Sequence, residues 1–290
     1  MRTSSASATT RGSIRRDGDT VEARILRRVG GGAPYFALEE VVFDGAELRA
    51  VAPTETDPGA ELGPVSAAEL ARHAVVAGLS AVALGRPDAA RCYYLVSGID
   101  ATLFRTSLTF GTRVRYSALA TEQGPVGGAA QVEARIEETL VSRLRVSYAV
   151  IPETLFTRLF ARHRTTTFGD FGSHKSYPPL EAVDYDRHSA SARLTVSTSA
   201  CRGHFDQHPA LPVSSLLGQL VRLTSSLWDG PFRVSSVRLR SQAVAWAGDE
   251  LDLRVAKSSG PWNFAGQASA AGRTVATANL CLLPAETTRD

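Results

Sequence analysis

Cysteine and lysine are scarce in this chain, and both scarcities narrow the possibilities. The three cysteines, Cys92, Cys201 and Cys281, lie far apart and form no CxxC pair, so neither a disulfide framework nor a zinc site is predicted. Arginine greatly outnumbers lysine, and the basic residues are dispersed along the chain. With a formal charge of only +3, the sequence offers no stripe that would neutralise a phosphate backbone. We therefore expect a cytoplasmic protein with no nucleic-acid partner.

Long hydrophobic runs are missing too. No segment approaches the ~20 consecutive apolar residues of a membrane span, so no membrane association is predicted. The opening stretch MRTSSASATTRGSIRRDGD is rich in Ser, Thr and Arg and has no apolar core, which argues against a secretory signal. We expect a disordered tail over residues 1–20. The composition, 43% hydrophobic and 21% charged, is typical of a globular domain.

An internal repeat divides the chain. The stretch PYFALEEVVFDGAELRAVAP (34–53) resembles PPLEAVDYDRHSASARLTVS (178–197), and each is followed by Pro-Val-Ser and an apolar helical pattern. We predict two copies, 21–152 and 178–290, joined over 153–177 by a short helix and a Gly/Ser/Pro-rich loop. The basic residues of that linker, Arg162 to Arg164 with His174 and Lys175, are candidates for contacting a phosphate or for ordinary solvation.

Each copy has the same expected elements. An alternating strand and a loop precede one long apolar helix, AAELARHAVVAGLSAVALG in the first copy and SLLGQLVRLTSSLW in the second. About four strands with period-two alternation follow each helix. One helix held against a curled antiparallel sheet is an α+β arrangement.

The segment GHFDQHPALPV (203–213) places two histidines in front of the second helix. Pro209 and Pro212 have fixed φ and push the preceding residues away from helical backbone, so we predict an ordered loop. His204 and His208 are four residues apart, yet that spacing indicates metal binding mainly on a helix, and no third ligand is suitably spaced. No metal is predicted.

This loop and helix resemble a family signature. GHFDQHPALPVSSLLGQL is similar to the GHFPGxPxxPGVLxxEAxxQ motif of the FabA/FabZ-type 3-hydroxyacyl-carrier-protein dehydratases, which have the hotdog fold. The matching positions are Gly203, His204, Phe205, Pro209, Pro212 and Leu216. The two-copy organisation resembles fused double hotdogs, so the resemblance implies two tandem hotdogs that form a pseudo-dimer.

The resemblance implies catalytic roles for two residues. In that family the motif histidine is a general base and a helix carboxylate of the other hotdog is the acid, which makes His204 the candidate base. Gly218 stands where the second helix would carry the acid, so Glu69, near the start of the first helix, is the candidate within one residue of the expected place. An ordinary first-turn carboxylate is the plainer interpretation of Glu69. The further candidate substrate-binding residues are Gly203, Phe205, Pro212, Gln219 and His73.

The first-copy loop PTETDPGAELGPVSA contains no histidine, so we expect one composite site and the loss of its symmetric twin. The favoured function is a 3-hydroxyacyl-thioester dehydratase, or an enoyl isomerase, of fatty-acid-like or polyketide biosynthesis. A hotdog thioesterase and a non-catalytic module that binds acyl carriers are the alternatives. The expected partner is an acyl group on carrier protein or coenzyme A, with no cofactor, in a monomeric pseudo-dimer or a homodimer.

Overall fold

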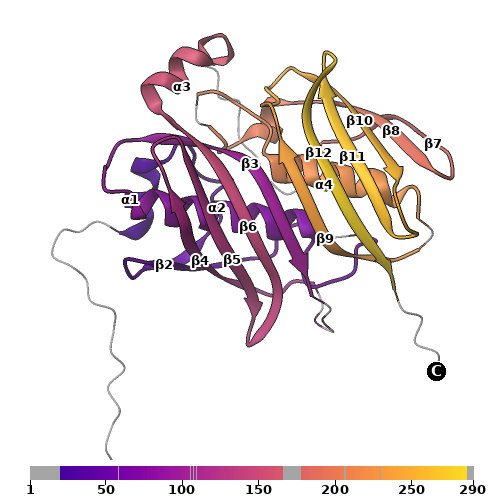
Figure 1. The fold of residues 1–290 in the computed structure, drawn as a ribbon, viewed down its shortest axis with the longest axis horizontal. Coiled ribbons are helices and arrows are strands. Elements are labelled where there is room, and N and C mark those ends of the chain that lie inside the picture. Colours follow the sequence, from indigo (N-terminus) through magenta and orange to yellow (C-terminus); the bar gives the residue numbers. More distant parts are fainter. Residues whose placement is uncertain are drawn as a thin grey trace, which may run out of the picture.

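One antiparallel sheet of twelve strands curls around two long helices in the computed structural model (Figure 1). The structure describes residues 20–57, 59–104, 106, 108, 110–165, 178–205, 207–228 and 230–285. The expected tail over 1–20 lies outside the described residues except for Thr20, as do His174 and Lys175 of the linker.

The first half runs from α1 to the helices that follow β6. Its elements are α1 (Val21–Arg28), β1 (Glu39–Phe43), β2 (Glu47–Ala52), α2 (Ala67–Gly85), β3 (Cys92–Leu103), β4 (Val114–Gln123), β5 (Gly127–Ile136), β6 (Thr139–Pro152), α3 (Glu153–Leu159) and a 3-10 turn, Ala161–His163. The second half contains β7 (Glu181–Tyr185), β8 (Ser189–Thr195), a 3-10 turn (Thr198–Cys201), α4 (Val213–Ser225), β9 (Phe232–Ser241), β10 (Glu250–Lys257), β11 (Asn263–Ala270) and β12 (Arg273–Pro284).

The two halves mirror each other in strand order. The sheet reads β1-β2-β4-β5-β6-β3 and then β9-β12-β11-β10-β8-β7, so each half repeats one connectivity and the halves meet at β3 and β9. At this seam Ile99 lies opposite Leu239, and both side chains are fully buried. The repeat seen in the sequence is therefore a structural repeat, although the residue boundaries of the two copies stay predictions.

Helix α2 is buried on every side. Its small residues permit close packing, since a Cβ on Gly78 would lie 2.5 Å from the Tyr148 hydroxyl and 3.1 Å from Ala130 Cβ. Within the described part of the chain, α2 is the one helix long and apolar enough to cross a membrane, contrary to the expectation that no segment comes close. In this structure that whole window is buried against the sheet and α4, which is the environment of a core helix.

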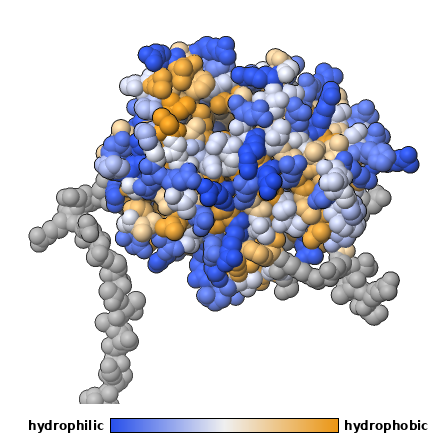
Figure 2. Space-filling model, viewed as in Figure 1, coloured by the Kyte–Doolittle hydropathy of each residue, from blue (hydrophilic) through white to orange (hydrophobic). Residues whose placement is uncertain are grey.

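Helix α1 was not expected from the sequence. Thr20 caps its first turn by accepting the Ala23 amide, and Ile25 packs into the core. Arg28 donates to the carbonyls of Ala83 and Arg86, which satisfies acceptors at the C-terminal end of α2. Figure 2 shows a mixed surface on which hydrophobic side chains gather at the end where Figure 1 places α3.

Candidate functional site

The loop 203–213 is held against the first half by a glycine that no other residue could replace without strain. Gly203 has φ +68°, and a Cβ there would lie 2.7 Å from the Tyr35 nitrogen and 2.8 Å from the Ala33 carbonyl carbon. Its carbonyl accepts the Gly32 amide at 2.9 Å. The loop of one half is thus fitted closely to the start of the other.

His204 is oriented by its own loop. Its Nδ1 lies 2.9 Å from the Ala210 carbonyl oxygen, and a carbonyl can only accept, so Nδ1 carries the proton. In the neutral ring Nε2 then holds the lone pair. The ring is stacked on Phe205 at 3.9 Å and tilted against Tyr35 at 4.9 Å. A neutral imidazole in this tautomer accepts a proton at Nε2, which is the chemistry that a general base requires.

Tyr35 and the start of α4 complete the surroundings of His204. Burial raises the pKa of Tyr35 to about 12, with the Ser214 hydroxyl and the charge of Arg72 acting against that rise, so the phenol remains neutral. Among the side chains that the structure describes, none caps the first turn of α4, which follows directly on Pro212. The amides of that turn are therefore donors beside the histidine, and their dipole favours negative charge. Sequence reasoning missed Tyr35, which lies far from the motif in the chain.

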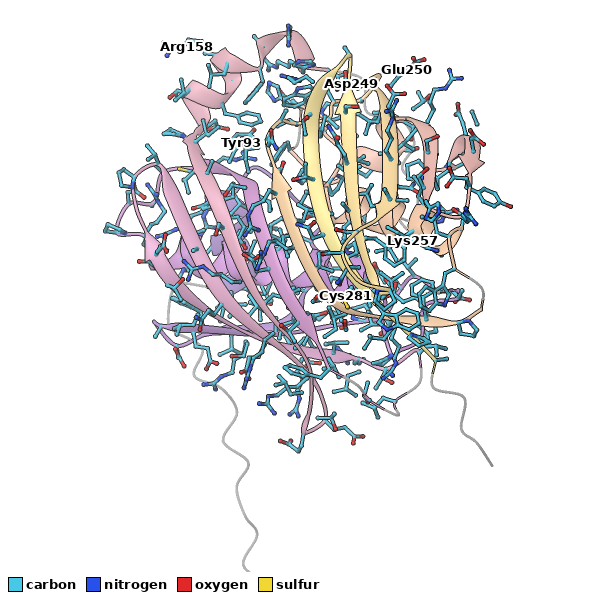
Figure 3. The ribbon with its side chains drawn as sticks, turned by 45° about the vertical axis from the view of Figure 1, so that its right-hand side comes forward. Tyr93, Arg158, Asp249, Glu250, Lys257 and Cys281 are labelled. Atoms are coloured by element: carbon cyan, nitrogen blue, oxygen red, sulfur yellow. The ribbon has the colours of Figure 1, made fainter. Side chains whose placement is uncertain are left out.

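Phe205 belongs to an aromatic core under α3. It has φ +65°, is buried, and packs against Tyr93 and Phe156, which stack on each other at 3.7 Å. Figure 3 places Tyr93 at the α3 end of the sheet. Trp246 continues the cluster, and His163 stacks on it at 4.4 Å. Phe205 thus anchors the loop in addition to its predicted contact with substrate.

A small apolar cavity adjoins His204. Its volume is about 40 Å³, and Leu95, Leu211, Val213 and Leu216 are among the side chains that line it. That is room for a water molecule and little more. An acyl chain would need these side chains to move.

Glu69 lies on the first turn of α2, and its carboxylate is held by its own half. It is 2% exposed and accepts the backbone N–H of Glu55 at 2.6 Å and of Thr56 at 3.1 Å. Burial raises the pKa of Glu69, and the two amides and Arg72 oppose that rise. None of the interactions that the structure gives for Glu69 involves His204. The catalytic pairing of these two residues stays a prediction.

His73 and Arg72 form a buried polar cluster with Glu69. Arg72 Nη2 pairs with Glu55 and lies 2.6 Å from His73 Nε2, while His73 Nδ1 lies 3.4 Å from the Tyr116 hydroxyl. Burial, and then the charge of Arg72, lowers the pKa of His73 well below its usual value. Glu55, Glu69 and His73 offer ligand atoms within 4.8 Å of one another, yet Arg72 pairs with Glu55 and lies against Nε2 of His73. The donor set therefore does not suit a cation.

Gln219 is a tether between segments. It is fully buried, donates to the Pro178 carbonyl at 2.5 Å and accepts weakly from Arg222 at 3.4 Å. It thereby fixes the chain that leads into β7. The predicted role of Gln219 in substrate binding stays a prediction. The same holds for the predicted role of His73.

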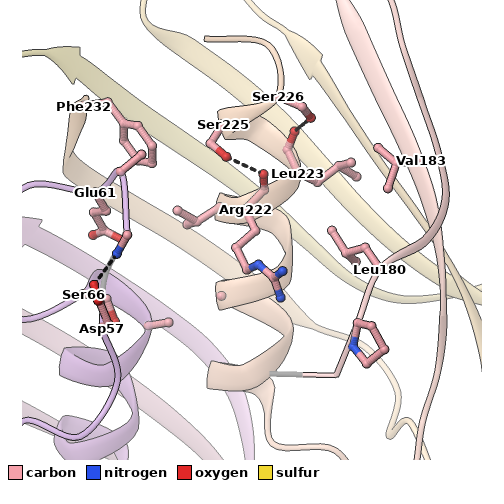
Figure 4. Close-up of a pocket in the computed structure, with 16 residues that line it drawn as sticks. Asp57, Glu61, Ser66, Leu180, Val183, Arg222, Leu223, Ser225, Ser226 and Phe232 are labelled. Carbon is pink, nitrogen blue, oxygen red and sulfur yellow. Dashed lines mark hydrogen bonds between the residues drawn. The ribbon is translucent and has the colours of Figure 1, made fainter. Parts of the chain in front are cut away.

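A pocket larger than the cavity beside His204 lies at the twin position, which is the place in the first half that corresponds to the His204 site. A pocket of about 700 Å³ lies between the first-half loop and the middle of α4, where Gly218 and Arg222 face it (Figure 4). The buried carboxyl of Glu61 lines it, and burial raises the pKa of Glu61 to about 7. Among the described residues that line this pocket there is no histidine, and the pocket is larger than the cavity beside His204. Glu61 was not predicted from the sequence. The signal that could have indicated it is a carboxylate six residues before the start of α2.

The likeness of this chain to known proteins rests on solved structures of low sequence identity. No protein-family model matches this chain, and no curated protein does either. Solved structures match over most of their length. An acyl-ACP thioesterase from Bacteroides thetaiotaomicron shares 13% identity over 81% of this chain and 97% of its own, with a TM-score of 0.54. A putative oleoyl thioesterase from Lactobacillus plantarum shares 11% over 83% and 98%, with a TM-score of 0.57.

A tesB protein from Mycobacterium avium subs paratuberculosis is similar to the same degree, with 12% identity over 85% of this chain and 96% of that one and a TM-score of 0.57. Identities this low establish the fold alone. The chain therefore has the hotdog fold. The closer resemblance to the FabA/FabZ-type dehydratases stays a prediction.

Proposed function

We propose that the protein is a fused double hotdog that acts on acyl thioesters, with its reaction centre at His204 and the first turn of α4. The observation that carries this proposal is the fixed Nδ1–H tautomer of His204 beside a helix N-terminus without a side-chain cap. The twin helix differs, because Ser66 and Glu61 accept amides of its first turn. Of the two core helices, α4 is the one whose first-turn amides have no side-chain cap among the described residues.

Thioester hydrolysis is the reaction that this geometry supports best. His204 Nε2 takes a proton from a water molecule, and the resulting hydroxide attacks the thioester carbonyl carbon. The first-turn amides of α4 hold the oxyanion that forms. The C–S bond then breaks, the carbonyl reforms, and the thiolate takes the proton back from His204, so that a free acid and a free thiol leave.

Hydrolysis requires a base and an oxyanion site, whereas dehydration also requires an acid for the departing hydroxyl. The residue predicted to be that acid, Glu69, has its oxygens engaged by the amides of Glu55 and Thr56. Similar solved structures include proteins described as acyl-ACP and oleoyl thioesterases. We therefore place hydrolysis ahead of the dehydratase interpretation.

Dehydration, or the related double-bond isomerisation, is the second candidate. The observation that favours it is the GHF motif at Gly203 to Phe205, which resembles the dehydratase signature. In that mechanism His204 removes a proton beside the thioester, and Glu69 would have to leave its amides to reach the hydroxyl.

Basic side chains lie on the surface beside the loop of His204, where an acyl carrier would approach. Arg164 donates to the Gln207 side chain at 2.8 Å, and the Thr165 amide donates to the Gln207 carbonyl, so the basic end of the linker lies along the loop of His204. Arg162 neighbours it after the turn of α3. We propose that these arginines meet the phosphate of a phosphopantetheine arm or of coenzyme A.

Product analysis tests the proposal. Purified protein is incubated with saturated, 3-hydroxyacyl and 2-enoyl thioesters, on carrier protein and on coenzyme A, and products are identified by mass spectrometry. Release of free acid that depends on His204 supports hydrolysis. Gain or loss of one water, abolished in both His204→Ala and Glu69→Gln, would establish the dehydratase instead. Retention of an acyl ligand without turnover would identify a binding module.

A further inference from the structure

The pocket at the twin position has the features of a built ligand site. Its volume of about 700 Å³ is within the range of small-molecule sites. Apolar side chains form much of its wall, contributed by the segment entering β7, by α4 and by the start of β9. These are Pro179, Leu180, Val183, Val221, Leu223 and Phe232. A chain of methylene groups would be desolvated there.

Among the described residues that line this pocket, Arg222 is the one cation. Arg222 projects from α4 into the hollow, with Leu180 on one side and Glu61 on the other (Figure 4). Its Nη1 is 3.4 Å from Gln219 Oε1, which is a weak contact, and no ion pair that the structure gives for the described residues includes Arg222. The guanidinium is thus placed to receive an anion.

A buried carboxyl group, that of Glu61, also lines this pocket. Glu61 is 7% exposed, and its Oε1 accepts the Ala67 amide at 2.8 Å. Within the described chain no hydrogen bond engages Oε2. Burial raises the pKa of Glu61 to about 7, so near neutrality Oε2 carries a proton in a large share of molecules. The Glu61 carboxyl is then a donor.

We propose that this pocket binds a free carboxylic acid with a long apolar chain, its carboxylate held between Arg222 and the protonated carboxyl of Glu61. Among the described residues that line the pocket, the charged side chains are Asp57 and Glu61 from the first-half loop and Arg222 from α4, while those from β7 and β9 are uncharged. A phosphate dianion would meet two carboxyl groups and one arginine, whereas a monoanionic carboxylate can share the Glu61 proton. The chemistry therefore selects a carboxylic acid.

A carboxylic acid of this kind is what the proposed hydrolysis would release. Its binding in this pocket does not depend on whether His204 catalyses that reaction. The site would let the protein hold a released acid away from the reaction centre. Because Glu61 must be protonated, affinity should fall as pH rises through its pKa, where the ionised carboxyl repels the ligand.

Isothermal titration with decanoate tests the proposal, at pH values about 1.5 units below and above the Glu61 pKa of about 7. We expect saturable binding that weakens about thirtyfold at the higher pH, because only the protonated fraction binds. Arg222→Gln should weaken binding about tenfold at both pH values. Glu61→Gln keeps the acceptor for the Ala67 amide and supplies a permanent donor, so it should bind equally at both.

Two controls locate the ligand. Decanol should bind without regard to pH or to Arg222→Gln, and His204→Ala should leave decanoate binding unchanged. Absence of saturable decanoate binding to the wild type, or equal affinity of wild type and Arg222→Gln, would overturn the proposal. A loss of decanoate binding in His204→Ala would also overturn it by placing the acid at the reaction centre. Thioester turnover is measured separately, so its failure leaves the result of this titration intact.

Discussion

Gly203 sets the position of His204 by allowing two backbones to approach each other. Replacing it with alanine puts a Cβ against Ala33 and Tyr35 at a backbone angle that favours glycine. We expect Gly203→Ala to lower the free energy of unfolding by about 3 kcal/mol. Thermal unfolding measures this, with Gly32→Ala as the matched control, since a Cβ on Gly32 meets nothing within 4 Å. Equal stability of the two variants would refute the tight fit of the loop.

The Glu61 carboxyl makes stability depend on pH with a definite sign. Its pKa in the folded protein, about 7, lies above the usual 4.5, so the folded state binds more protons between those values and stability falls as pH rises through that window. The loss is of order 3 kcal/mol. Glu61→Gln removes this ionisation, so above pH 7 it should be the more stable protein in urea unfolding, with little difference below the unfolded pKa. A wild type that is equally stable across the window would contradict the burial of this group.

At the scale of residues, the sequence identifies candidate site residues that share one local motif. It does not identify residues that reach a site from a distant part of the chain. His204 stands out because GHF and two prolines frame it within one segment. Tyr35 and Arg222 carry no local signal: Tyr35 lies beside His204 only because Gly203 docks on residues 32–35, and Arg222 lines the same pocket as Glu61 only because α4 packs against α2.

Among the elements, the start of α2 depends on Glu69. Its carboxylate satisfies the Glu55 and Thr56 amides and so ties the loop after β2 to the helix. Glu69→Ala should cost about 2 kcal/mol of stability, because two amides lose their acceptor. Glu153→Ala, which removes a half-exposed first-turn carboxylate of α3, should cost less than about 1 kcal/mol in the same thermal unfolding measurement. Comparable losses would indicate that Glu69 is an ordinary surface-like carboxylate.

The long elements were predictable because their periodicity is strong. The helix over AAELARHAVVAGLSAVALG occupies Ala67–Gly85 as expected, and four strands follow each core helix. Helix α1 was missed since it is short and stabilised by contacts with β1 and α2, through Glu22 and Arg28, that no local pattern announces. The hairpins β1–β2 and β7–β8 were each seen as one strand because their turns interrupt the alternation only briefly.

At the scale of the whole molecule, the seam between β3 and β9 makes the two halves one sheet. Ile99 and Leu239 face each other there in the core, whereas the pairs of Asp100 with Arg238 and Arg240 lie half-exposed and contribute little. Ile99→Ala should cost about 2–5 kcal/mol through the cavity it leaves. Urea unfolding followed by fluorescence and by circular dichroism should still give one coincident transition. Two separate transitions would show that the halves fold as independent domains.

The two halves have diverged around a common plan. The second half keeps an open helix N-terminus beside a histidine, while the first fills its helix N-terminus with Ser66 and Glu61 and retains the larger pocket. The proposed fused double hotdog permits this division, because residues of both halves line each of the two pockets and the pockets need not stay alike.

The role of His204 as the general base is tested most directly by kcat/KM for release of free acid by wild type, His204→Ala and Glu69→Gln on one thioester. We expect a fall of about a hundredfold or more for His204→Ala, as for a lost general base, and a change within about threefold for Glu69→Gln. Full activity in His204→Ala would contradict the assignment of the reaction centre. An equal collapse in both variants would replace it with the composite site that pairs His204 with Glu69.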